Sequence, residues 1–455
     1  MKESETHFLV FGAGKSGIAA AKLLQEKHCP VRLYDSKESI QAADLISQEP
    51  SLREVPMIFG TLPREVMEET DVAVLSPGVP TDLPVVNEMR EHGIRIWGEI
   101  ELAYVMGHGK VLAITGTNGK TTTTTLLGEI MKEACADVKV VGNIGIPYTA
   151  VAADTTEDSV IVAEISSFQL ETIHDFHPAV SAILNITPDH LNRHHTMENY
   201  IAAKESITRN QTPEEVCVLN YEDDVLREFG KTCGARVVYF SSRRELSEGV
   251  YLKNDEILIA QGGEIRKICN TDELAIFGEH NYENVMAASA MALSFGVPMD
   301  RLHHALVHFT AVPHRIEYVA TKRGVRFYND SKGTNPDAAI KAIRSMKWPT
   351  LLIGGGYDKG SEFDEWINAF DGKVKKLVLM GVTSQKIADT ALRLGFPKED
   401  IIFVKDLREA VDTCYANAES GDAVLLSPAC ASWDMFRSYE ERGDQFRDMA
   451  NALDE

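Results

Sequence analysis

The sequence predicts an α/β protein made of three domains, each built around its own parallel sheet. Short apolar runs alternate with helical stretches along the chain, which is typical of parallel strands joined by helices. Glycine-containing loops of the kind that binds phosphate follow apolar runs near Gly12, Gly116 and Gly354. The length of 455 residues allows about three domains of roughly 150 residues each.

The predicted strands are short apolar runs bounded by Gly, Pro, Ser or Asp, as expected for buried strands. They are Phe8–Phe11, Val31–Tyr34, Val72–Leu75, Val111–Ile114, Val160–Ile165, Val180–Leu184, Val216–Leu219, Ile316–Ala320, Val325–Tyr328, Thr350–Ile353, Leu377–Met380, Ile401–Val404 and Ala423–Leu426. Predicted helices between them include Ile18–Lys27, Thr122–Ala134, Met197–Arg209 and Asn284–Phe295. From Val250 to Ile268 short alternating runs with Asn-Asp and Gly-Gly turns predict hairpins instead. Domain boundaries near Trp97–Gly98 and Phe309–Pro313 give predicted domains of residues 1–98, 99–310 and 311–455.

Composition excludes several classes of protein. The chain has 46 basic and 68 acidic residues, a net charge of −22, which argues against broad binding to nucleic acid or anionic membranes. The seven cysteines form no C-x-x-C pair, so neither a metal ribbon nor a disulfide framework is expected. No apolar run is long enough to span a bilayer, and the N-terminus does not resemble a signal peptide. We therefore expect a cytoplasmic protein without membrane insertion.

The first glycine loop is Gly12-Ala13-Gly14-Lys15-Ser16-Gly17, between a strand and a helix. Such glycines let the backbone approach a phosphate, and Asp35 stands about 20 residues on, as in dinucleotide-binding sites. The motif fits a nucleotide diphosphate, an NAD-dependent oxidoreductase, or merely a tight strand-to-helix turn. A second loop, Ser76–Pro80, ends another strand at the sheet edge where ligands bind.

The strongest motif is Thr115-Gly116-Thr117-Asn118-Gly119-Lys120-Thr121-Thr122, again between a strand and a helix. Backbone amides of such a P-loop surround phosphates, Lys120 reaches the β- and γ-phosphates, and the Thr121 hydroxyl can bind Mg²⁺. The motif departs from the strict P-loop pattern because Ile114 stands where that pattern has glycine. The alternative is a chance Gly-Lys-Thr at a helix start.

A carboxylate follows the next strand. Glu164 at a strand end beside a P-loop is typical of a second magnesium ligand. Ser166 or Ser167 can also cap a helix there, and the two roles are compatible.

The segment Asn185–His195 places His190 and His194 four residues apart, as in a zinc helix. Leu191 stands where a zinc hydrolase needs Glu, so zinc hydrolysis is not favoured. His190 alone can be structural or catalytic, and the default role of Lys204 is that of a solvated helix lysine. Asn281 and Asn284 share one helix face, where they can cap the helix or contact a base.

Three polar loops follow strands in the last third of the chain: Asp330–Pro336, Gly354–Gly360 and Ser427–Asp434. Since the carboxyl ends of parallel strands meet at one sheet edge, we expect these loops to form one ligand-binding region. Cys430, within the last loop, is expected to be a small buried residue rather than a nucleophile.

Together, these motifs resemble the Mur ligase superfamily of ATP-dependent amide ligases over nearly the whole chain. The shared marks are the P-loop, the Glu164 and Asn185–His190 segments, His280 to Asn284, His314-Arg315 and Asp330-Ser331-Lys332. The Gly354–Lys359 and Ser427–Asp434 segments resemble the branch that adds D-glutamate to UDP-N-acetylmuramoyl-L-alanine. Another amino-acid-adding branch, or a folylpolyglutamate-type ligase, is the alternative within the superfamily; an NAD-dependent oxidoreductase or an ATP-hydrolysing switch is the alternative outside it.

The resemblance implies a Rossmann-like N-terminal domain that binds UDP, a central P-loop ATPase-like domain and a Rossmann-like C-terminal domain that binds the amino acid. The implied residues for the UDP-substrate are Gly14, Lys15, Ser16, Asp35, Ser36, Lys37, Gly78, Asn143, Ser166, Gln169 and His190. Those implied for ATP are Gly116, Thr117, Asn118, Gly119, Lys120, Thr121, Thr122, Asn281, Asn284, Arg315, Asp330 and Lys332. Those implied for D-glutamate are Thr334, Lys359, Ser427 and Phe436.

The resemblance further implies two Mg²⁺ ions, for which Mn²⁺ can substitute. Their implied ligands are Thr121, Glu164, His190 and Lys204, the last as a CO₂-derived carbamate, and the implied catalytic residues are Lys120, Glu164, His190 and Lys204. The implied reaction forms an acyl phosphate and releases ADP and phosphate, in peptidoglycan precursor synthesis by a cytoplasmic monomer whose domains close on binding.

Overall fold

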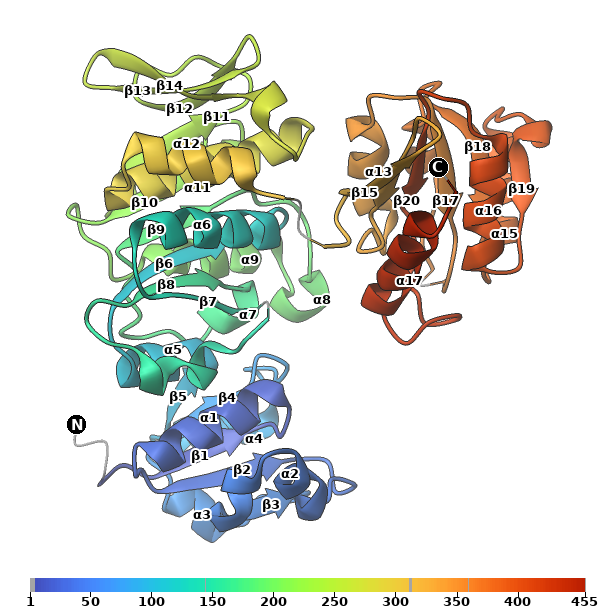
Figure 1. Cartoon of the computed structure of the whole chain (residues 1–455). Helices are drawn as coiled ribbons and strands as arrows, with labels where there is room; N and C mark the ends of the chain where they lie inside the picture. The colour runs from blue at the N-terminus through green and yellow to red at the C-terminus, as the bar shows by residue number, and fades with distance from the viewer. Residues whose placement is uncertain (1–4, 144, 311–312, 359, 455) are drawn as a thin grey trace. The chain divides into compact units, whose positions relative to one another are not determined.

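The computed structural model describes residues 5–143, 145–310, 313–358 and 360–454, and these residues form three sheets (Figure 1). Two compact units are present: Met1–Glu273 with Glu283–Val307, and Leu274–Tyr282 with His308–Glu455. The first unit holds two of the sheets and the second unit holds the third. The three-sheet α/β architecture predicted from the sequence is therefore confirmed.

The N-terminal sheet is parallel, in the order β3-β2-β1-β4-β5. Its strands are β1 (Phe8–Phe11), β2 (Val31–Asp35), β3 (Met57–Phe59), β4 (Val72–Leu75) and β5 (Arg95–Gly98). Its helices are α1 (Lys15–Glu26), α2 (Ala42–Gln48), α3 (Arg64–Glu68) and α4 (Pro84–Glu91). Strand β1 shows how the layers form. Its alternate residues Phe8 and Val10 share a core with α1 and with α5 (Glu99–Met106), whereas Leu9 and Phe11 pack with α3 and α4.

The central sheet has the order β14-β13-β12-β11-β10-β9-β6-β8-β7. Its strands are β6 (Lys110–Thr115), β7 (Val138–Gly142), β8 (Val160–Glu164), β9 (Val180–Ile183), β10 (Val216–Asn220), β11 (Arg236–Ser241), β12 (Gly249–Lys253), β13 (Glu256–Gln261) and β14 (Glu264–Asn270). Strands β6 to β12 pair in parallel, and β12 to β14 form antiparallel hairpins, as predicted. Its helices are α6 (Lys120–Ala134), α7 (Ser167–Leu170), α8 (Leu191–His194), α9 (Met197–Glu205), α10 (Asp224–Phe229), α11 (Glu279–Phe295) and α12 (Met299–His308).

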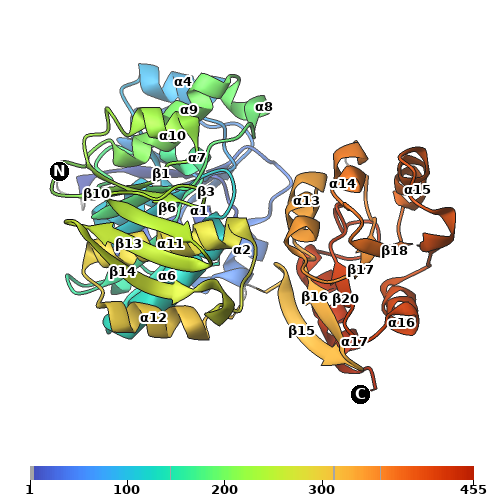
Figure 2. The same ribbon diagram turned by 90° about the horizontal axis from the view of Figure 1, so that it is seen from above.

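The C-terminal sheet has the order β15-β16-β20-β17-β18-β19, with only the β15–β16 pair antiparallel among its described residues. Its strands are β15 (Glu317–Lys322), β16 (Val325–Asn329), β17 (Thr350–Gly354), β18 (Val374–Leu379), β19 (Ile401–Phe403) and β20 (Ala423–Leu426). Helices α13 (Pro336–Ser345), α14 (Asp364–Asn368) and α15 (Ser384–Arg393) cover one face, and α16 (Leu407–Asn417) and α17 (Tyr439–Asn451) cover the other (Figure 2).

Four strands escaped prediction: β3, β5, β7 and β11. Three of them, β3, β5 and β7, lie at sheet edges, where a strand needs no continuous apolar run. Strand β7 illustrates the reason, because most of its residues are half-buried and Lys139 interrupts the apolar pattern. Helix α11 also begins at Glu279, five residues before the predicted start at Asn284.

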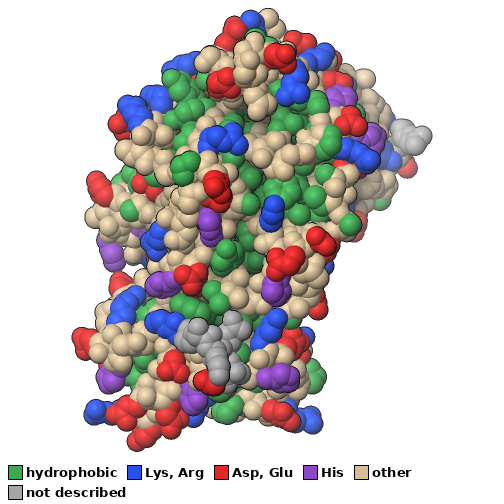
Figure 3. Space-filling view, turned by 90° about the vertical axis from the view of Figure 1, so that its left-hand side faces the viewer, with side chains coloured by type: hydrophobic (Ala, Val, Ile, Leu, Met, Phe, Trp, Pro, Cys, Tyr) green, Lys and Arg blue, Asp and Glu red, His purple; other side chains and the backbone are tan. Residues whose placement is uncertain are grey.

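Among the described residues, no helix is long and apolar enough to cross a membrane. On the face shown in Figure 3, acidic, basic and histidine side chains are interspersed rather than sorted by sign.

The first glycine loop depends on close backbone packing at one position. A Cβ atom on Gly17 would lie 1.7 Å from the carbonyl oxygen of Gly12, which is far inside contact distance. A Cβ on Gly14 would meet nothing within 4 Å. The last glycine of the loop is therefore required for packing of α1 on β1, while Gly14 is not.

These two glycines give a matched test. We expect Gly17→Ala to lower the free energy of unfolding by about 1–3 kcal/mol, the usual cost of overpacking, and to lower the melting temperature. Gly14→Ala is expected to leave the melting temperature unchanged. Thermal unfolding followed by circular dichroism measures both, and equal melting temperatures for the two variants would contradict this account.

Candidate active site

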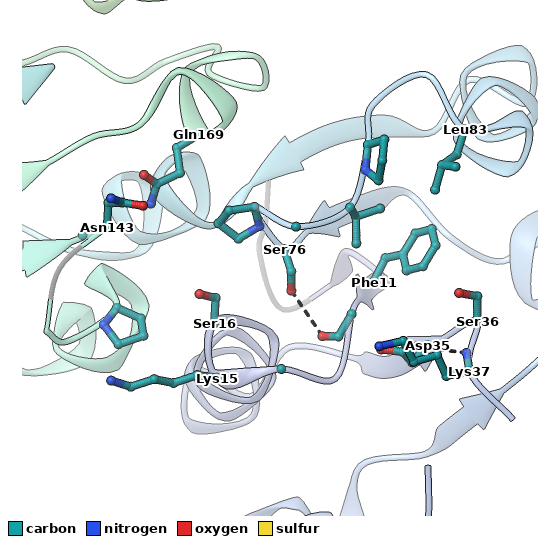
Figure 4. Close-up of a pocket in the computed structure, with 18 of the residues that line it drawn as sticks. Phe11, Lys15, Ser16, Asp35, Ser36, Lys37, Ser76, Leu83, Asn143 and Gln169 are labelled. Carbon is teal, nitrogen blue, oxygen red and sulfur yellow. Dashed lines mark hydrogen bonds between the residues drawn. The ribbon is translucent and has the colours of Figure 1, made fainter. Parts of the chain in front are cut away.

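A cavity of about 720 Å³ opens at the carboxyl edge of the N-terminal sheet (Figure 4). The loops after β1, β2 and β4 form one side, and central-domain residues including Asn143 and Gln169 form the other. It brings together all the residues predicted for the UDP-substrate except Ser166 and His190. Those present are Gly14, Lys15, Ser16, Asp35, Ser36, Lys37, Gly78, Asn143 and Gln169.

Asp35 organises the N-terminal side of this cavity. One oxygen of its carboxylate accepts the Ala13 N–H at 2.8 Å, and the other accepts the Lys37 N–H at 3.0 Å. Lys15 crosses to the central domain, where its Nζ donates to the carbonyl of Gly145 at 2.5 Å. The carboxylate thus holds two loops in place, and the two lysines provide positive charge at the rim.

Gln169 is held from two directions. Its Oε1 accepts the backbone N–H and the hydroxyl of Ser166, both at 2.9 Å, within the capping box that starts α7. Its Nε2 donates to Glu99 at 3.2 Å, and Glu99 is buried, with its pKa raised mainly by burial. Ser166 therefore caps the helix, which was one of its two predicted roles. Glu99 was missed by the sequence reasoning, because its partner is 70 residues away.

The P-loop joins β6 to α6 as predicted. Gly119 has φ of 85°, a left-handed conformation that favours glycine, and a Cβ there would lie 2.3 Å from the Asn284 side-chain oxygen. Asn284 also accepts from the Thr123 hydroxyl at 3.2 Å. The structure therefore places Asn284 at the N-terminus of α6, next to the P-loop.

Three residues outside the predicted set hold the P-loop in shape. Asn185 accepts the Asn118 N–H at 2.8 Å and donates its side-chain amide back to the Asn118 carbonyl at 3.0 Å. The Thr117 hydroxyl lies 3.1 Å from the Thr187 carbonyl and 3.0 Å from the buried Tyr200 hydroxyl. Tyr200 stands four residues before Lys204 on α9, and this i,i+4 spacing is the signal that could have identified it.

Lys204 is not the solvated lysine of the default expectation. Its side chain is 1% exposed, and its Nζ donates to the carbonyl of Gly116 at 2.8 Å. Lys120 donates to the same carbonyl oxygen, also at 2.8 Å. Burial, and secondarily the positive charge of Lys120, lower the pKa of Lys204 to about 7. A substantial fraction of this amine is therefore neutral near neutral pH.

The environment of the Glu164 carboxylate suits the role of a metal ligand. It is 1% exposed; its Oε1 accepts from the Asn143 side chain at 2.8 Å, and its Oε2 is buried without a hydrogen-bond partner. An unsatisfied buried carboxylate oxygen is costly unless a cation or ligand completes it. No group of three or more His, Cys, Asp or Glu side chains suited to a metal occurs in the described chain, so a metal here needs hydroxyl, carbamate or phosphate oxygens too.

Of the three histidines in the Asn185–His195 segment, His190 and His194 differ in environment. The His190 side chain is 52% exposed, and its ring centroid lies 4.9 Å from that of Phe168. His194 is buried, approaches Ser167 at 2.9 Å and Glu171 at 3.4 Å, and has its pKa lowered mainly by burial. Only His190 is available to a ligand of these two, and zinc on this helix remains disfavoured.

In the second unit, the predicted polar loops meet at one sheet edge. The Ser427 hydroxyl donates to Asp330 at 2.7 Å, and burial raises the pKa of Asp330 to about 7. The fully buried Arg442 donates to Ser331 Oγ at 2.9 Å and to the Ser331 carbonyl at 2.8 Å, and it reaches the Cys430 carbonyl at 3.3 Å. Cys430 is buried with its pKa raised to about 11, as expected of a structural thiol.

The other residues predicted to bind ATP or D-glutamate differ in burial and in their contacts. Asn281 is buried in the second unit and donates to the Phe277 carbonyl at 2.9 Å. The Arg315 Nε is buried without a hydrogen-bond partner, and Lys332 Nζ lies 5.7 Å from the Tyr439 ring. Phe436 packs on the apolar core and Thr334 is half-buried, whereas Lys359 lies outside the described residues.

The lowered pKa of Lys204 gives a pH test. The ordinary lysine value is 10.5, so between pH 7 and about 10 the unfolded chain holds the proton at this position more often than the folded chain. The contribution of Lys204 to the free energy of unfolding therefore rises with pH in this window. We expect the unfolding free energy of the unmodified chain, minus that of Lys204→Met, to increase from pH 7 to 9. Urea titrations in CO₂-free buffer measure the difference, and a constant value would count against the buried, neutral amine.

Comparisons with known proteins agree with the three-sheet architecture. The Mur ligase MurD-like N-terminal domain model matches residues 6–98, the Mur ligase middle domain model matches 114–292, and the Mur ligase glutamate ligase domain model matches 314–430. Among solved structures, UDP-N-acetylmuramate-alanine ligase MurC of Thermotoga maritima has a TM-score of 0.60 at 19% identity, covering 98% of this chain and 99% of its own. That likeness shows the fold.

Curated relatives are far more similar in sequence. The UDP-N-acetylmuramoylalanine–D-glutamate ligase of Lachnoclostridium phytofermentans is 56% identical, and that of Lachnospira eligens 53%, each over 98% of both chains. The protein of the same name from Clostridioides difficile is 46% identical, again over 98% of both chains. With such similarity along its whole length, the chain belongs to the Mur ligase family.

Proposed function

We propose that this protein is an ATP-dependent ligase that joins D-glutamate to UDP-N-acetylmuramoyl-L-alanine, with release of ADP and phosphate. The observation that carries the proposal is full-length identity of 46–56% to relatives named for this reaction. The geometry supports it, because the first unit holds both a cavity suited to a nucleotide diphosphate and a P-loop. Neither an oxidoreductase nor another amino-acid-adding ligase has comparable support.

The cavity of the first unit would bind the UDP-substrate. Lys15 and Lys37 supply positive charge for a diphosphate, and the start of α1 supplies backbone N–H groups. Asn143 and Gln169 line the central-domain side, where they would contact the sugar and its peptide arm. Ser166 and His190 lie outside this lining set, so their predicted contacts with the substrate have less support.

The P-loop would bind ATP through its backbone amides and Lys120. The N-terminus of α6 favours the phosphates electrostatically, and Asn284 stands at this end of the helix. The predicted partners Asn281, Arg315, Asp330 and Lys332 belong to the second unit. We propose that residues 1–98 bind UDP, 99–310 bind ATP and 311–455 bind the amino acid.

The reaction would proceed in two steps. The terminal carboxylate of the UDP-substrate attacks the γ-phosphate of ATP, so that ADP leaves and an acyl phosphate forms. The amine of D-glutamate then attacks the acyl carbon, and collapse of the tetrahedral intermediate releases phosphate. Lys120 holds a positive charge where two anions must approach each other, which lowers the barrier electrostatically. No nucleophile from the protein is required.

Lys204 has the chemistry for carbamate formation. A neutral amine reacts with CO₂ to give a carbamate and a proton, and the pKa of about 7 supplies the neutral amine. The product would be an anion beside Lys120, so the two side chains would form an ion pair. Mg²⁺, held by Thr121 and Glu164 and at a second position by His190 and the carbamate, would offset phosphate charge when bound. Mn²⁺ can substitute, because imidazole suits softer ions.

The amino-acid site is proposed at the loop edge of the C-terminal sheet. Thr334, Lys359, Ser427 and Phe436 remain its predicted residues. The Ser427 hydroxyl is already donated to Asp330, which favours a supporting role for it. A cytoplasmic location and a monomeric state also remain predictions.

A panel of amino acids tests the substrate assignment. We expect phosphate release from ATP only when UDP-N-acetylmuramoyl-L-alanine and D-glutamate are both present, and not with L-glutamate, D-alanine or L-lysine. A coupled phosphate assay measures this. Release without the UDP-substrate would indicate an ATPase, and release with a different amino acid would indicate another branch of the family.

Lys204→Ala tests the carbamate. We expect turnover to fall by at least about 10²-fold, the scale of losing one electrostatic group at a reaction centre, with partial rescue by formate or acetate. Lys204→Arg keeps a positive charge but cannot form the carbamate, and it is the matched control that should stay inactive with these acids. Full activity of Lys204→Ala without added acid would contradict the role.

A further inference from the structure

We propose that Arg193 is a positioning residue for the UDP-substrate, because it fixes the backbone on both sides of Gly78. This inference rests on the proposed function. Arg193 lies on α8 of the central domain, outside every predicted set. Its Nη1 donates to the Pro77 carbonyl at 2.7 Å, and its Nη2 donates to the Val79 carbonyl at 3.2 Å. One guanidinium therefore binds the two carbonyls that flank Gly78.

Peptide geometry links this contact to the cavity. In a trans peptide, the carbonyl and the N–H point in opposite directions. The Pro77 carbonyl and the Gly78 N–H share one peptide plane, so Arg193, by binding the carbonyl, keeps this N–H on the opposite side of the loop. Gly78 lines the cavity, and a backbone N–H fixed in this way can donate to an anionic oxygen of a UDP group.

The loop has limited support of its own. The Val79 N–H donates to the Ser76 carbonyl at 2.9 Å, and the Ser76 hydroxyl donates to the Gly12 carbonyl at 3.2 Å (Figure 4). Gly78 itself is exposed. These contacts anchor the start of the loop, whereas Arg193 restrains the part that surrounds Gly78.

Arg193 is itself rigidly held. Its Nη2 also donates to Glu171 at 2.9 Å, with the two side chains 14% and 16% exposed. The guanidinium carbon lies 4.1 Å from the centroid of the Phe168 ring, which in turn contacts His190. The same Glu171 oxygen accepts from the Thr81 hydroxyl at 3.2 Å, just beyond the loop. Arg193 thus connects the Ser76–Pro80 loop to the segment that carries His190, a proposed metal ligand.

Lysine cannot reproduce this arrangement. Arginine offers a planar fork that serves two carbonyls and a carboxylate at once, and its flat face stacks on an aromatic ring. A lysine ammonium retains the charge but is a single point on a flexible stem. Arg193→Lys therefore tests positioning separately from charge.

The experiment compares Arg193→Lys and Arg193→Gln with Arg209→Lys in the full-length chain. Arg193 and Arg209 both line a second, smaller cavity beside α9, and Arg209 donates to the Ile173 carbonyl at 2.7 Å, within the central domain. We expect Arg193→Lys to raise KM for the UDP-substrate and the Kd for UDP by about tenfold, which corresponds to ~1.4 kcal/mol. KM for ATP, and the melting temperature, should stay close to those of Arg209→Lys.

Calorimetric titration with UDP separates this inference from the proposed function. Equal UDP affinity in Arg193→Lys and the unmodified chain would overturn the role of Arg193, whatever the ligase assay shows. A proportional loss in both KM values together with a lowered melting temperature would also overturn it, because that pattern indicates a general folding role. An unmodified chain that binds no UDP would overturn the proposed function itself.

Discussion

Two lysine side chains share one carbonyl oxygen in the first unit, and much of the candidate site depends on this arrangement. Lys120 and Lys204 each donate to the Gly116 carbonyl at 2.8 Å. The P-loop is thereby tied to α9, and Tyr200 adds a second tie through Thr117. Burial, and secondarily the positive charge of Lys120, lower the pKa of Lys204. The fold thus places a readily deprotonated lysine beside Lys120.

Lysines in three loops of the first unit make an acidic protein compatible with the anionic substrates proposed for it. The net charge of −22 describes the whole chain, whereas Lys15, Lys37 and Lys120 lie in the loops proposed to bind phosphate. Charges that lie close to a ligand in a partly enclosed place act more strongly than distant, solvated ones. An acidic exterior and locally basic loops are therefore compatible.

Local patterns in the sequence predicted the sheets and the glycine loops, because a strand–glycine loop–helix unit is encoded by neighbouring residues. Edge strand β7 was missed, since a half-buried strand needs no unbroken apolar run. Tyr200 and Arg193 were missed for another reason: their partners Thr117 and Pro77 lie 83 and 116 residues away in the sequence. A local sequence pattern cannot predict contacts between residues so far apart in the chain. Ser427 shows a different limit: the resemblance implies that it binds D-glutamate, and only the structure adds that its hydroxyl donates to Asp330, 97 residues away.

The 720 Å³ cavity of the first unit is lined by residues from both the N-terminal and the central domain. Its glycine loops belong to the N-terminal sheet, yet Asn143 and Gln169 close its far side, and Lys15 is fastened to Gly145. Gln169 in turn depends on Glu99, at the start of the helix that follows the N-terminal sheet. Neither domain alone supplies all the residues that line this cavity. Exchange of the first 98 residues with those of a related ligase would replace one wall of this cavity and leave the other, so contacts such as Lys15 to Gly145 constrain both domains.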